Sequence, residues 1–213
     1  MNNRLALSIL FIICLAGGSV GAQDGFGVVA SENELKQRLN EASDAVQTLS
    51  SHFTQIKYIA LLDEKIHSEG MFFYKKSDCI CLEYSSPASH SIVINRQQMK
   101  IVSDGKTNIY DVGKNKMMAQ MNMLLAACMT GNFGKLTGEY RLSFQESDNQ
   151  YRIHIQPLAN RTSFVKDMDI LLNKQDLSVQ ELKMTEPSDD YTLYTFTGKK
   201  KNIQLPASKF KIK

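Results

Sequence analysis

The chain has 213 residues, and 43% of them are hydrophobic, which suits one domain with a sizeable buried core. Its 25 basic and 22 acidic residues nearly balance, for a formal net charge of +3. Because no basic stripe with interleaved aromatic residues accompanies this balance, the sequence does not indicate a nucleic-acid-binding protein.

The first 22 residues have the three parts of an export signal in the right order. Met1–Arg4 is short and positively charged, Leu5–Gly17 is apolar, and Ala22 supplies the small residue before a cleavage site. The apolar run is shorter than the ~20 residues that span a bilayer, and no later segment approaches that length. We therefore expect residues 1–22 to be a cleaved signal peptide, rather than an uncleaved anchor or a buried helix, and residues 23–213 to form a single exported domain.

A helix is predicted after a flexible start at Gln23–Ala30. Ser31 is a suitable N-cap, and Glu34 three residues later completes a capping box. Apolar residues then recur at helical spacing and form one stripe: Leu35, Leu39, Ala42, Val46 and Leu49. The pattern predicts an amphipathic helix of about five turns that ends near Ser50.

From His52 onward the hydrophobic pattern has a period of two, and the segments are rich in aromatic and β-branched residues, as strands are. Asp104-Gly105 is a pair that tight hairpin turns favour. Six strands are predicted in this half of the chain: Phe53–Tyr58, Glu69–Tyr74, Cys79–Tyr84, Ser91–Asn95, Met99–Ser103 and Thr107–Val112.

A second helix is predicted at Met117–Met129, where β-branched residues are few, and it ends at Gly131–Gly134. Only Gln120 and Asn122 are polar within it, so most of its circumference is apolar. Strands then resume between polar turns, at Tyr140–Gln145, Tyr151–Gln156, Ser163–Asn173, Leu177–Thr185, Tyr191–Thr197 and a terminal stretch that ends at Pro206.

Roughly ten or eleven strands without βαβ alternation indicate a mainly β (α+β) fold. We expect one large, curled antiparallel sheet that does not close, with two or three helices available to cover one of its faces.

The sequence contains none of the common catalytic or metal-binding motifs. His52, His67, His90 and His154 are scattered, no HExxH, GxSxG, P-loop or GxGxxG occurs, and Asp189-Asp190 lies in a turn-like stretch. We therefore expect no enzymatic activity, no metal and no cofactor.

The cysteines form no regular framework. Cys14 lies inside the apolar run of the signal and not at a lipidation site, and three cysteines remain after it. Cys79 and Cys81 are two residues apart on a predicted strand and so share one face. An odd number without regular spacing is a poor disulfide pattern, and we expect Cys79, Cys81 and Cys128 to be small buried side chains.

Methionine is unusually concentrated in the second helix, with five residues between Met117 and Met129. One interpretation is an ordinary core helix. The other is a movable, adaptable wall over an apolar cavity, because methionine packs against irregular partners without requiring one shape. A sheet of more than about eight strands can enclose more volume than its own side chains fill, which favours the second interpretation.

An ordered series of short motifs runs from Phe53 to Tyr110: Phe53-Thr54-Gln55, Gly70-Met71-Phe72-Phe73-Tyr74-Lys75-Lys76, Tyr84-Ser85-Ser86-Pro87, Ile92-Val93-Ile94, and Ser103-Asp104-Gly105-Lys106 before Tyr110. In order and spacing this series resembles the LolA-type family of periplasmic outer-membrane lipoprotein carriers. The resemblance implies an unclosed β-barrel with a helical lid, located in the periplasm. It also implies that the ligand is the acyl chains of lipoproteins, carried from the inner to the outer membrane by a chaperone.

The sequence departs from the family pattern Lys-Arg-Pro, which reads Lys75-Lys76-Ser77 here. The resemblance makes Lys76 the candidate lid latch, although lysine cannot copy the planar hydrogen-bonding fork of arginine. The aromatic positions that follow in the family hold Ile80 and Leu82. These departures also fit a relative that carries another lipid-like cargo.

We predict that the lipid-binding surface is built from apolar residues of the first strands and the second helix: Phe53, Ile56, Phe72, Tyr74, Ile80, Leu82, Met118, Met121 and Leu125. The expected partners are acylated lipoproteins or other lipids, with transient contacts to an inner-membrane export complex and an outer-membrane acceptor, and the protein is expected to be a monomer. The alternative from another class is a lipid-sensing, protein-binding module of envelope signalling on the same fold.

Overall fold

The computed structural model describes residues 25–213 except residues 78, 115 and 159–162. The predicted signal peptide, residues 1–22, lies outside these described residues.

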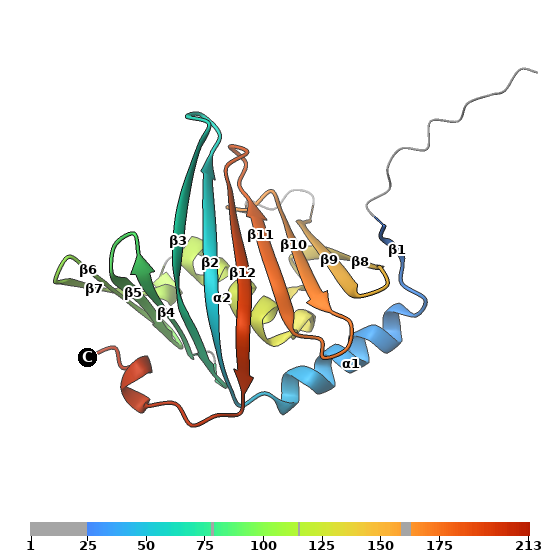
Figure 1. Ribbon diagram of the computed structural model, residues 1–213, viewed down its shortest axis with the longest axis horizontal. Helices are drawn as coiled ribbons and strands as arrows, with labels where there is room; N and C mark the ends of the chain where they lie inside the picture. The colour runs from blue at the N-terminus through green and yellow to red at the C-terminus, as the bar shows by residue number, and fades with distance from the viewer. Residues whose placement is uncertain (1–24, 78, 115, 159–162) are drawn as a thin grey trace, which may run out of the picture.

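One antiparallel sheet contains every strand that the structure describes, and Figure 1 shows it as a curled wall that does not close. The strand order is β1-β8-β9-β10-β11-β12-β2-β3-β4-β5-β6-β7. The strands are β1 (Gly27–Val28), β2 (Thr48–Ile59), β3 (Glu64–Lys75), β4 (Cys79–Ser86), β5 (His90–Asn95), β6 (Gln98–Ser103), β7 (Lys106–Asp111), β8 (Tyr140–Glu146), β9 (Gln150–Pro157), β10 (Asp167–Asn173), β11 (Val179–Thr185) and β12 (Tyr191–Lys201). The predicted mainly β, unclosed half-barrel is confirmed.

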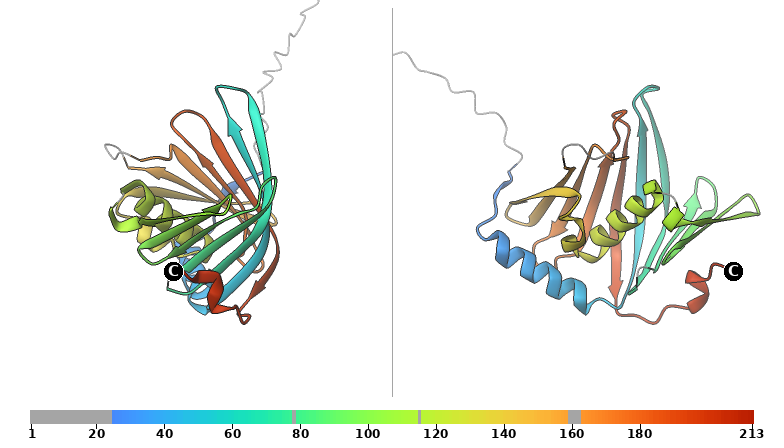
Figure 2. Two further views of the ribbon diagram at one scale, coloured as in Figure 1. Left: turned by 90° about the vertical axis from the view of Figure 1, so that its left-hand side faces the viewer. Right: turned by 180° about the vertical axis from the view of Figure 1, so that it is seen from behind.

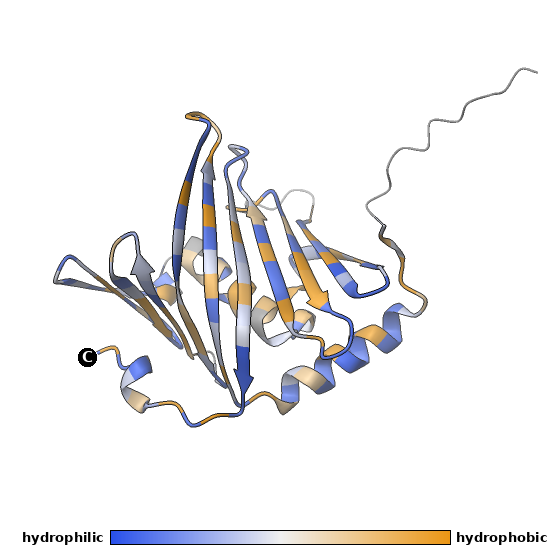
Figure 3. Cartoon of the chain, in the orientation of Figure 1, coloured by the Kyte–Doolittle hydropathy of each residue, from blue (hydrophilic) through white to orange (hydrophobic). Residues whose placement is uncertain are grey.

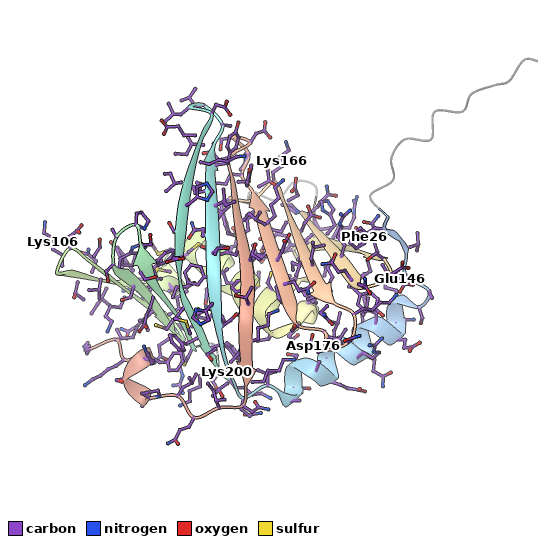
Figure 4. All side chains as sticks on the ribbon, in the orientation of Figure 1. Phe26, Lys106, Glu146, Lys166, Asp176 and Lys200 are labelled. Atoms are coloured by element: carbon purple, nitrogen blue, oxygen red, sulfur yellow. The ribbon has the colours of Figure 1, made fainter. Side chains whose placement is uncertain are left out.

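The strand missed by the sequence pattern is β1, in the segment predicted to be flexible. Its two residues pair with the end of β8, and the backbone N–H of Ala30 donates to Oε1 of Glu146 over 2.9 Å. The guanidinium of Arg152 lies 4.0 Å from the ring centroid of Phe26, and Figure 4 shows Phe26 and Glu146 at this edge of the sheet. These contacts hold a segment whose sequence has no strand pattern.

Helix α1 (Glu32–Ala45) begins as predicted, because the Ser31 side chain accepts a hydrogen bond from the backbone N–H of Glu34. It ends earlier than predicted: Val46 is extended and β2 already begins at Thr48. Leu49 instead pairs across strands with Tyr74 and Lys201, and its side chain is still buried. The apolar stripe therefore continues into the core through a strand.

Helix α2 (Lys116–Thr130) confirms the second predicted helix. It ends at Gly131, whose φ of +78° suits glycine and whose N–H donates to the carbonyl of Ala127. Three short 3₁₀ helices complete the fold: η1 (Val112–Lys114), η2 (Phe133–Leu136) and η3 (Ala207–Phe210). Figure 2 shows α2 lying in the hollow of the sheet, and we call the face it covers the concave face.

The core lies between the concave face and the helices. Strand register aligns apolar side chains in rows across this face, since residues directly opposite one another share a face. One such row crosses five strands: Phe144, Ile153, Ile170, Leu182 and Tyr194. The alternation of apolar and polar residues along these strands is visible in Figure 3.

The C-terminal segment packs on the opposite face of β3, β4 and β5 and forms a second small core there. Phe210 and Ile212 bury Phe73, Cys79 and Cys81, and the Lys209 ammonium lies 2.6 Å from a Glu83 carboxylate oxygen. The stretch that ends at Pro206 was predicted to be a strand. It is instead part of this C-terminal segment and has no strand structure.

Cys79, Cys81 and Cys128 are buried side chains, as expected. Burial raises the pKa of the Cys81 thiol to about 12, with a smaller contribution from Glu83, so this thiol stays protonated and unreactive at neutral pH.

Gly70 is required on β3 where β4 carries a bulge at Ser85. A Cβ atom at Gly70 would lie 2.0 Å from the Glu83 carbonyl oxygen and 2.9 Å from Cζ of Phe53. We expect Gly70→Ala to lower the free energy of unfolding by about 2–3 kcal/mol, because backbone must move to admit the methyl group. Gly138→Ala is the matched control, since a Cβ at Gly138 meets nothing within 4 Å. Equal stability of the two variants in denaturant titrations would contradict this account.

Candidate functional site

Eight of the nine residues predicted to bind lipid lie together where the helical cover meets the sheet. Phe53, Phe72, Tyr74, Ile80 and Leu82 belong to the buried core cluster, and Met118, Met121 and Leu125 of α2 pack against it. Apolar side chains from three adjacent strands and one helix therefore meet on the concave face.

Ile56 is the exception. Side chains alternate along a strand, and the register of β2 is regular from Phe53 to Tyr58, so Ile56 points to the opposite face from Phe53. It is half-buried and lies outside the core cluster. Its assignment to the cavity is corrected here, because an odd separation along a regular strand puts two side chains on opposite faces.

The space left between α2 and the sheet is very small. A cavity of about 10 Å³ is lined by Phe72, Ile80, Leu82, Leu125, Leu182, Tyr194 and Phe196. A single water needs ~10–15 Å³ of such volume, so the side chains leave almost no space at this point beneath α2. A separate cavity of about 120 Å³ lies nearer α1 and is lined in part by Leu39, Phe133 and Phe144. A ligand can enter the space beneath Leu125 only if α2 moves away from the sheet.

Three lining residues, Leu182, Tyr194 and Phe196, were not predicted from the sequence. They reach the site because β12 pairs with β2 and β11 with β12, which places Phe196 opposite Phe53 and Leu182 opposite Tyr194. The sequence signal for these residues was the strand pattern of Leu193–Thr197, in which aromatic side chains occupy every second position. The pattern did not show which strand would pair with this segment.

Aromatic rings form the centre of the site. The Phe53 ring makes edge contacts with Tyr84 at 5.0 Å and with Tyr194 at 5.8 Å between centroids, and Phe72 meets Phe196 at 5.8 Å. Such edge-to-face pairs each contribute ~0.5–1.5 kcal/mol beyond the burial of their area. These packed aromatic rings form a well-ordered apolar surface on the concave face.

Polar groups of two tyrosines and a glutamine lie next to this apolar surface. The Tyr84 and Tyr194 hydroxyls lie 3.2 Å apart, and the bond between them uses only one of their two protons. Gln55 lies directly opposite Tyr194 on β2, and its Oε1 atom is buried without a hydrogen-bond partner. The pair of hydroxyls thus offers a donor, and Gln55 offers an acceptor, at the edge of an apolar surface.

Gln120 and Asn122, the polar residues in the interior of α2, differ in their hydrogen bonds. Gln120 donates from Nε2 to a Glu139 carboxylate oxygen over 3.3 Å, whereas Oδ1 of Asn122 is buried without a partner. A buried, unpaired polar atom costs ~1–3 kcal/mol. This cost opposes the covered arrangement and lowers the free energy needed to move α2.

Lys76 makes its polar contacts with α1 and the residues just after it, and with none of the described α2 side chains. Its ammonium donates to the Asp44 carbonyl over 2.9 Å and lies 3.7 Å from the Asp44 carboxylate, and its backbone N–H donates to the Gln47 carbonyl. A cation at the C-terminal end of a helix also interacts favourably with the helix dipole. Lys76 thus joins the end of β3 to the last turn of α1.

Helix α1 in turn packs against the end of α2. The Leu39 carbonyl lies 3.6 Å from the position that a Cβ of Gly131 would occupy, and Leu35 and Leu39 are buried in the same core cluster as Leu124. The two helices therefore form one connected cover, tied to the sheet at Lys76.

Within the described part of the chain, no group of three His, Cys, Asp or Glu side chains could hold a metal ion. No helix among the same residues is long and apolar enough to cross a membrane.

The arrangement defines a class of protein, the open antiparallel half-barrel whose apolar concave face is covered by helices. The family model "Outer membrane lipoprotein carrier protein LolA" matches residues 44–213, and the chain therefore belongs to the LolA family. The resemblance seen in the sequence is confirmed, and the chain is a divergent member. It is similar to an outer-membrane lipoprotein carrier protein of Pseudomonas entomophila (strain L48), with 22% identity over 212 residues, 97% of this chain and 93% of that protein.

The chain is also similar in shape to solved structures that are distant from it in sequence. A LolA superfamily protein from Nitrosomonas europaea has a TM-score of 0.42 and 9% identity, with 83% of this chain and 97% of that chain covered. Lipoprotein LppX of Mycobacterium tuberculosis has a TM-score of 0.46 and 8% identity, with 83% and 100% covered. An uncharacterized conserved protein from Thermus thermophilus has a TM-score of 0.49 and 7% identity, with 81% and 90% covered.

The Tyr84–Tyr194 pair makes the free energy of unfolding depend on pH in the alkaline range. Burial raises the pKa of Tyr194 well above its usual value of 10.0, helped by Tyr84, and burial also raises the pKa of Tyr84. Both stay protonated in the folded protein while the unfolded chain loses these protons above about pH 10, so stability falls as pH rises through that range. We expect a decline of up to ~1.4 kcal/mol per pH unit for each tyrosine.

The double variant Tyr84→Phe/Tyr194→Phe keeps the ring shapes and removes both hydroxyls together. Its free energy of unfolding should decline less steeply between about pH 10 and 11 than that of the parent protein, measured by urea titration. Parallel declines of parent and variant would show that the pair is not held protonated by the fold.

Proposed function

We propose that the protein is a non-enzymatic periplasmic carrier that binds the acyl chains of lipoproteins on its concave face, and that residues 1–22 direct its export and are then cleaved. In this proposal the protein carries the lipoproteins from the inner to the outer membrane, with transient contacts to an export complex and an acceptor. The observation that carries the proposal is an apolar face of the sheet covered by a helix that is itself apolar around most of its circumference. Membership of the LolA family supports it.

The physical need for such a face is set by the cargo. Each methylene group removed from water contributes roughly 0.8 kcal/mol, so a long acyl chain cannot cross an aqueous compartment uncovered. In the proposed cycle α2 moves away from the sheet, and the acyl chain lies between the sheet and the α2 side chains, including Met118, Met121 and Leu125. Apolar contacts are exchanged for apolar contacts, which keeps the free energy of loading and release small.

The polar border gives the bound lipid a direction. Esters and amides, which join acyl chains to their head groups, present carbonyl acceptors, and amides also present an N–H donor. The spare proton of the Tyr84–Tyr194 pair suits the carbonyl, and Oε1 of Gln55 suits an amide N–H. We propose that the acyl chain lies over Phe53 and Phe72 with its polar linkage at this border.

Displacement of a fluorescent fatty-acid probe by a synthetic acylated lipopeptide tests the function. We expect Leu125→Asp to lower the affinity for both ligands at least tenfold, because a carboxylate at the cavity wall is desolvated when the ligand binds. Ile56→Ser on the opposite face of β2 is the matched control and should bind normally. A parent protein that binds neither probe nor lipopeptide would refute the carrier function, and binding of the probe but not the lipopeptide would indicate another lipid-like cargo.

Lys76 is proposed to hold the cover closed through α1. We expect Lys76→Met to speed release of a bound acyl probe by up to about fivefold, since an exposed ion pair contributes at most ~1 kcal/mol. Lys76→Arg can donate to the same carbonyl and should release the probe at the parent rate. Lys75→Met, the exposed neighbour on the other face of β3, is the control. Release rates from stopped-flow fluorescence that are the same in all three variants would show that Lys76 is not a latch.

A further inference from the structure

The turn between β2 and β3 exposes two leucines. Leu61 is 92% exposed and Leu62 is 59% exposed. Three other hairpin turns of the sheet have the polar composition that turns usually have. The turns after β5, β6 and β8 hold only polar residues and glycine: Arg96-Gln97, Asp104-Gly105 and Ser147-Asp148-Asn149. The composition of the β2–β3 turn, Ala60 to Asp63, is therefore not required by turn formation.

The β2–β3 hairpin also projects beyond the strands beside it (Figure 1). Its two strands have 12 residues each, but β4 pairs with β3 only at Glu69–Lys75. On the other side, the pairing of β12 with β2 ends at Tyr58. The apolar turn stands at the end of this projection, as the hydropathy colours of Figure 3 show. We call the segment Ile59–Ile66 the hairpin tip.

The tip is held in a defined conformation. The N–H of Leu62 donates to the Ile59 carbonyl over 3.2 Å, and the Tyr58 hydroxyl donates to a carboxylate oxygen of Asp63 over 2.9 Å. The N–H of Ala60 donates to a carboxylate oxygen of Asp190, from the turn between β11 and β12, over 2.8 Å. These bonds hold the backbone of the turn in place while the two leucines face solvent. Binding through the leucines therefore does not require the turn to become ordered first.

Charges around the tip nearly cancel. Lys57 is paired with Glu186, and the Lys166 ammonium lies 2.5 Å from Asp189. The tip itself holds Asp63, Glu64 and Lys65, Asp190 adds a second negative charge beside it, and Lys183 offsets one of the two. This small negative excess does not favour an anionic surface, and an attachment to net-neutral headgroups made here should depend little on salt.

Two aromatic rings lie on the hairpin and its neighbour, next to the turn. Tyr58 and Tyr191 are stacked, with centroids 5.0 Å apart, and the Lys183 ammonium lies 4.7 Å from the Tyr191 centroid. Tyrosines beside an apolar anchor are typical of the headgroup level of a bilayer.

We propose that the hairpin tip inserts Leu61 and Leu62 into the headgroup–acyl boundary of a bilayer with net-neutral headgroups, so that the protein itself docks on membranes. A narrow, convex tip needs a matching pocket in a protein partner, whereas a fluid bilayer accepts it without one. Two leucines provide a weak, reversible attachment, comparable to the marginal hold of a single short lipid anchor. The proposal concerns a surface separate from the concave face and does not rest on the carrier function.

Flotation of the purified protein with vesicles of phosphatidylethanolamine and phosphatidylcholine tests the proposal. We expect Leu61→Ser/Leu62→Ser to reduce the vesicle-bound fraction about tenfold or more, from the lost burial of two side chains. Val28→Ser, which removes an aliphatic side chain that is 86% exposed on β1, is the matched control and should bind like the parent. Binding of the parent should persist at high salt. Equal binding by all three proteins, or loss of parent binding in salt, would overturn the proposal.

A direct probe of insertion is available because the chain contains no tryptophan. In Leu61→Trp the emission should shift to the blue on addition of vesicles and be quenched by lipids brominated on the acyl chains, while Val28→Trp should show neither effect. An unshifted Leu61→Trp would overturn the proposal. So would a change in sedimentation of Leu61→Ser/Leu62→Ser without vesicles, which would assign the tip to contact with a second copy. Acyl-probe affinity should be unchanged in these variants, so failure of the carrier function would be seen separately.

Discussion

The contact between α2 and the concave face determines the rest of the structure. Alternation along the strands places apolar side chains from Phe144 on β8 to Leu82 on β4 on one side of a single sheet. A closed barrel would cover such a face with its own strands, but this sheet ends at β1 and β7, which do not pair with each other. An element outside the sheet must therefore remove the face from water, and α2, supported by α1, is that element.

The contact between α2 and the sheet is stable but does not fix a single orientation of the helix. A helix with one apolar stripe has a single orientation on its sheet, whereas α2 is apolar around most of its circumference and has no polar face that must stay in water. Met118, Met121 and Met123 pack against the core cluster with side chains that adapt to irregular partners, and the unpaired Oδ1 of Asn122 makes the covered state less favourable than a fully satisfied core. The residues of α2 thus both stabilise the fold and allow the helix to be displaced from the sheet.

Local patterns predicted the elements, and pairing between distant strands determined the site. The Ser31 cap, the apolar helix and the Asp104-Gly105 turn depend on neighbours in sequence, so the sequence alone revealed them. Tyr194 and Phe196 reach the cavity only because β12 returns to pair with β2. The end of α1 was misjudged because Leu49 reaches the core equally well from a helix or a strand. Lys76 could be chosen by its position, but its acceptor, the Asp44 carbonyl, is a tertiary contact.

A carrier of apolar cargo has to limit how much apolar surface it shows to water. Uncovering the concave face would cost about 25 cal/mol for each Å² of apolar area exposed, so without a ligand the closed arrangement, with only about 10 Å³ left under α2, is favoured. Leu61 and Leu62 are few enough to stay exposed without causing aggregation, since proteins in water tolerate small apolar patches. The large apolar surface is thus kept covered while a small one stays available, and in the proposed function one chain can both carry lipid and touch a membrane.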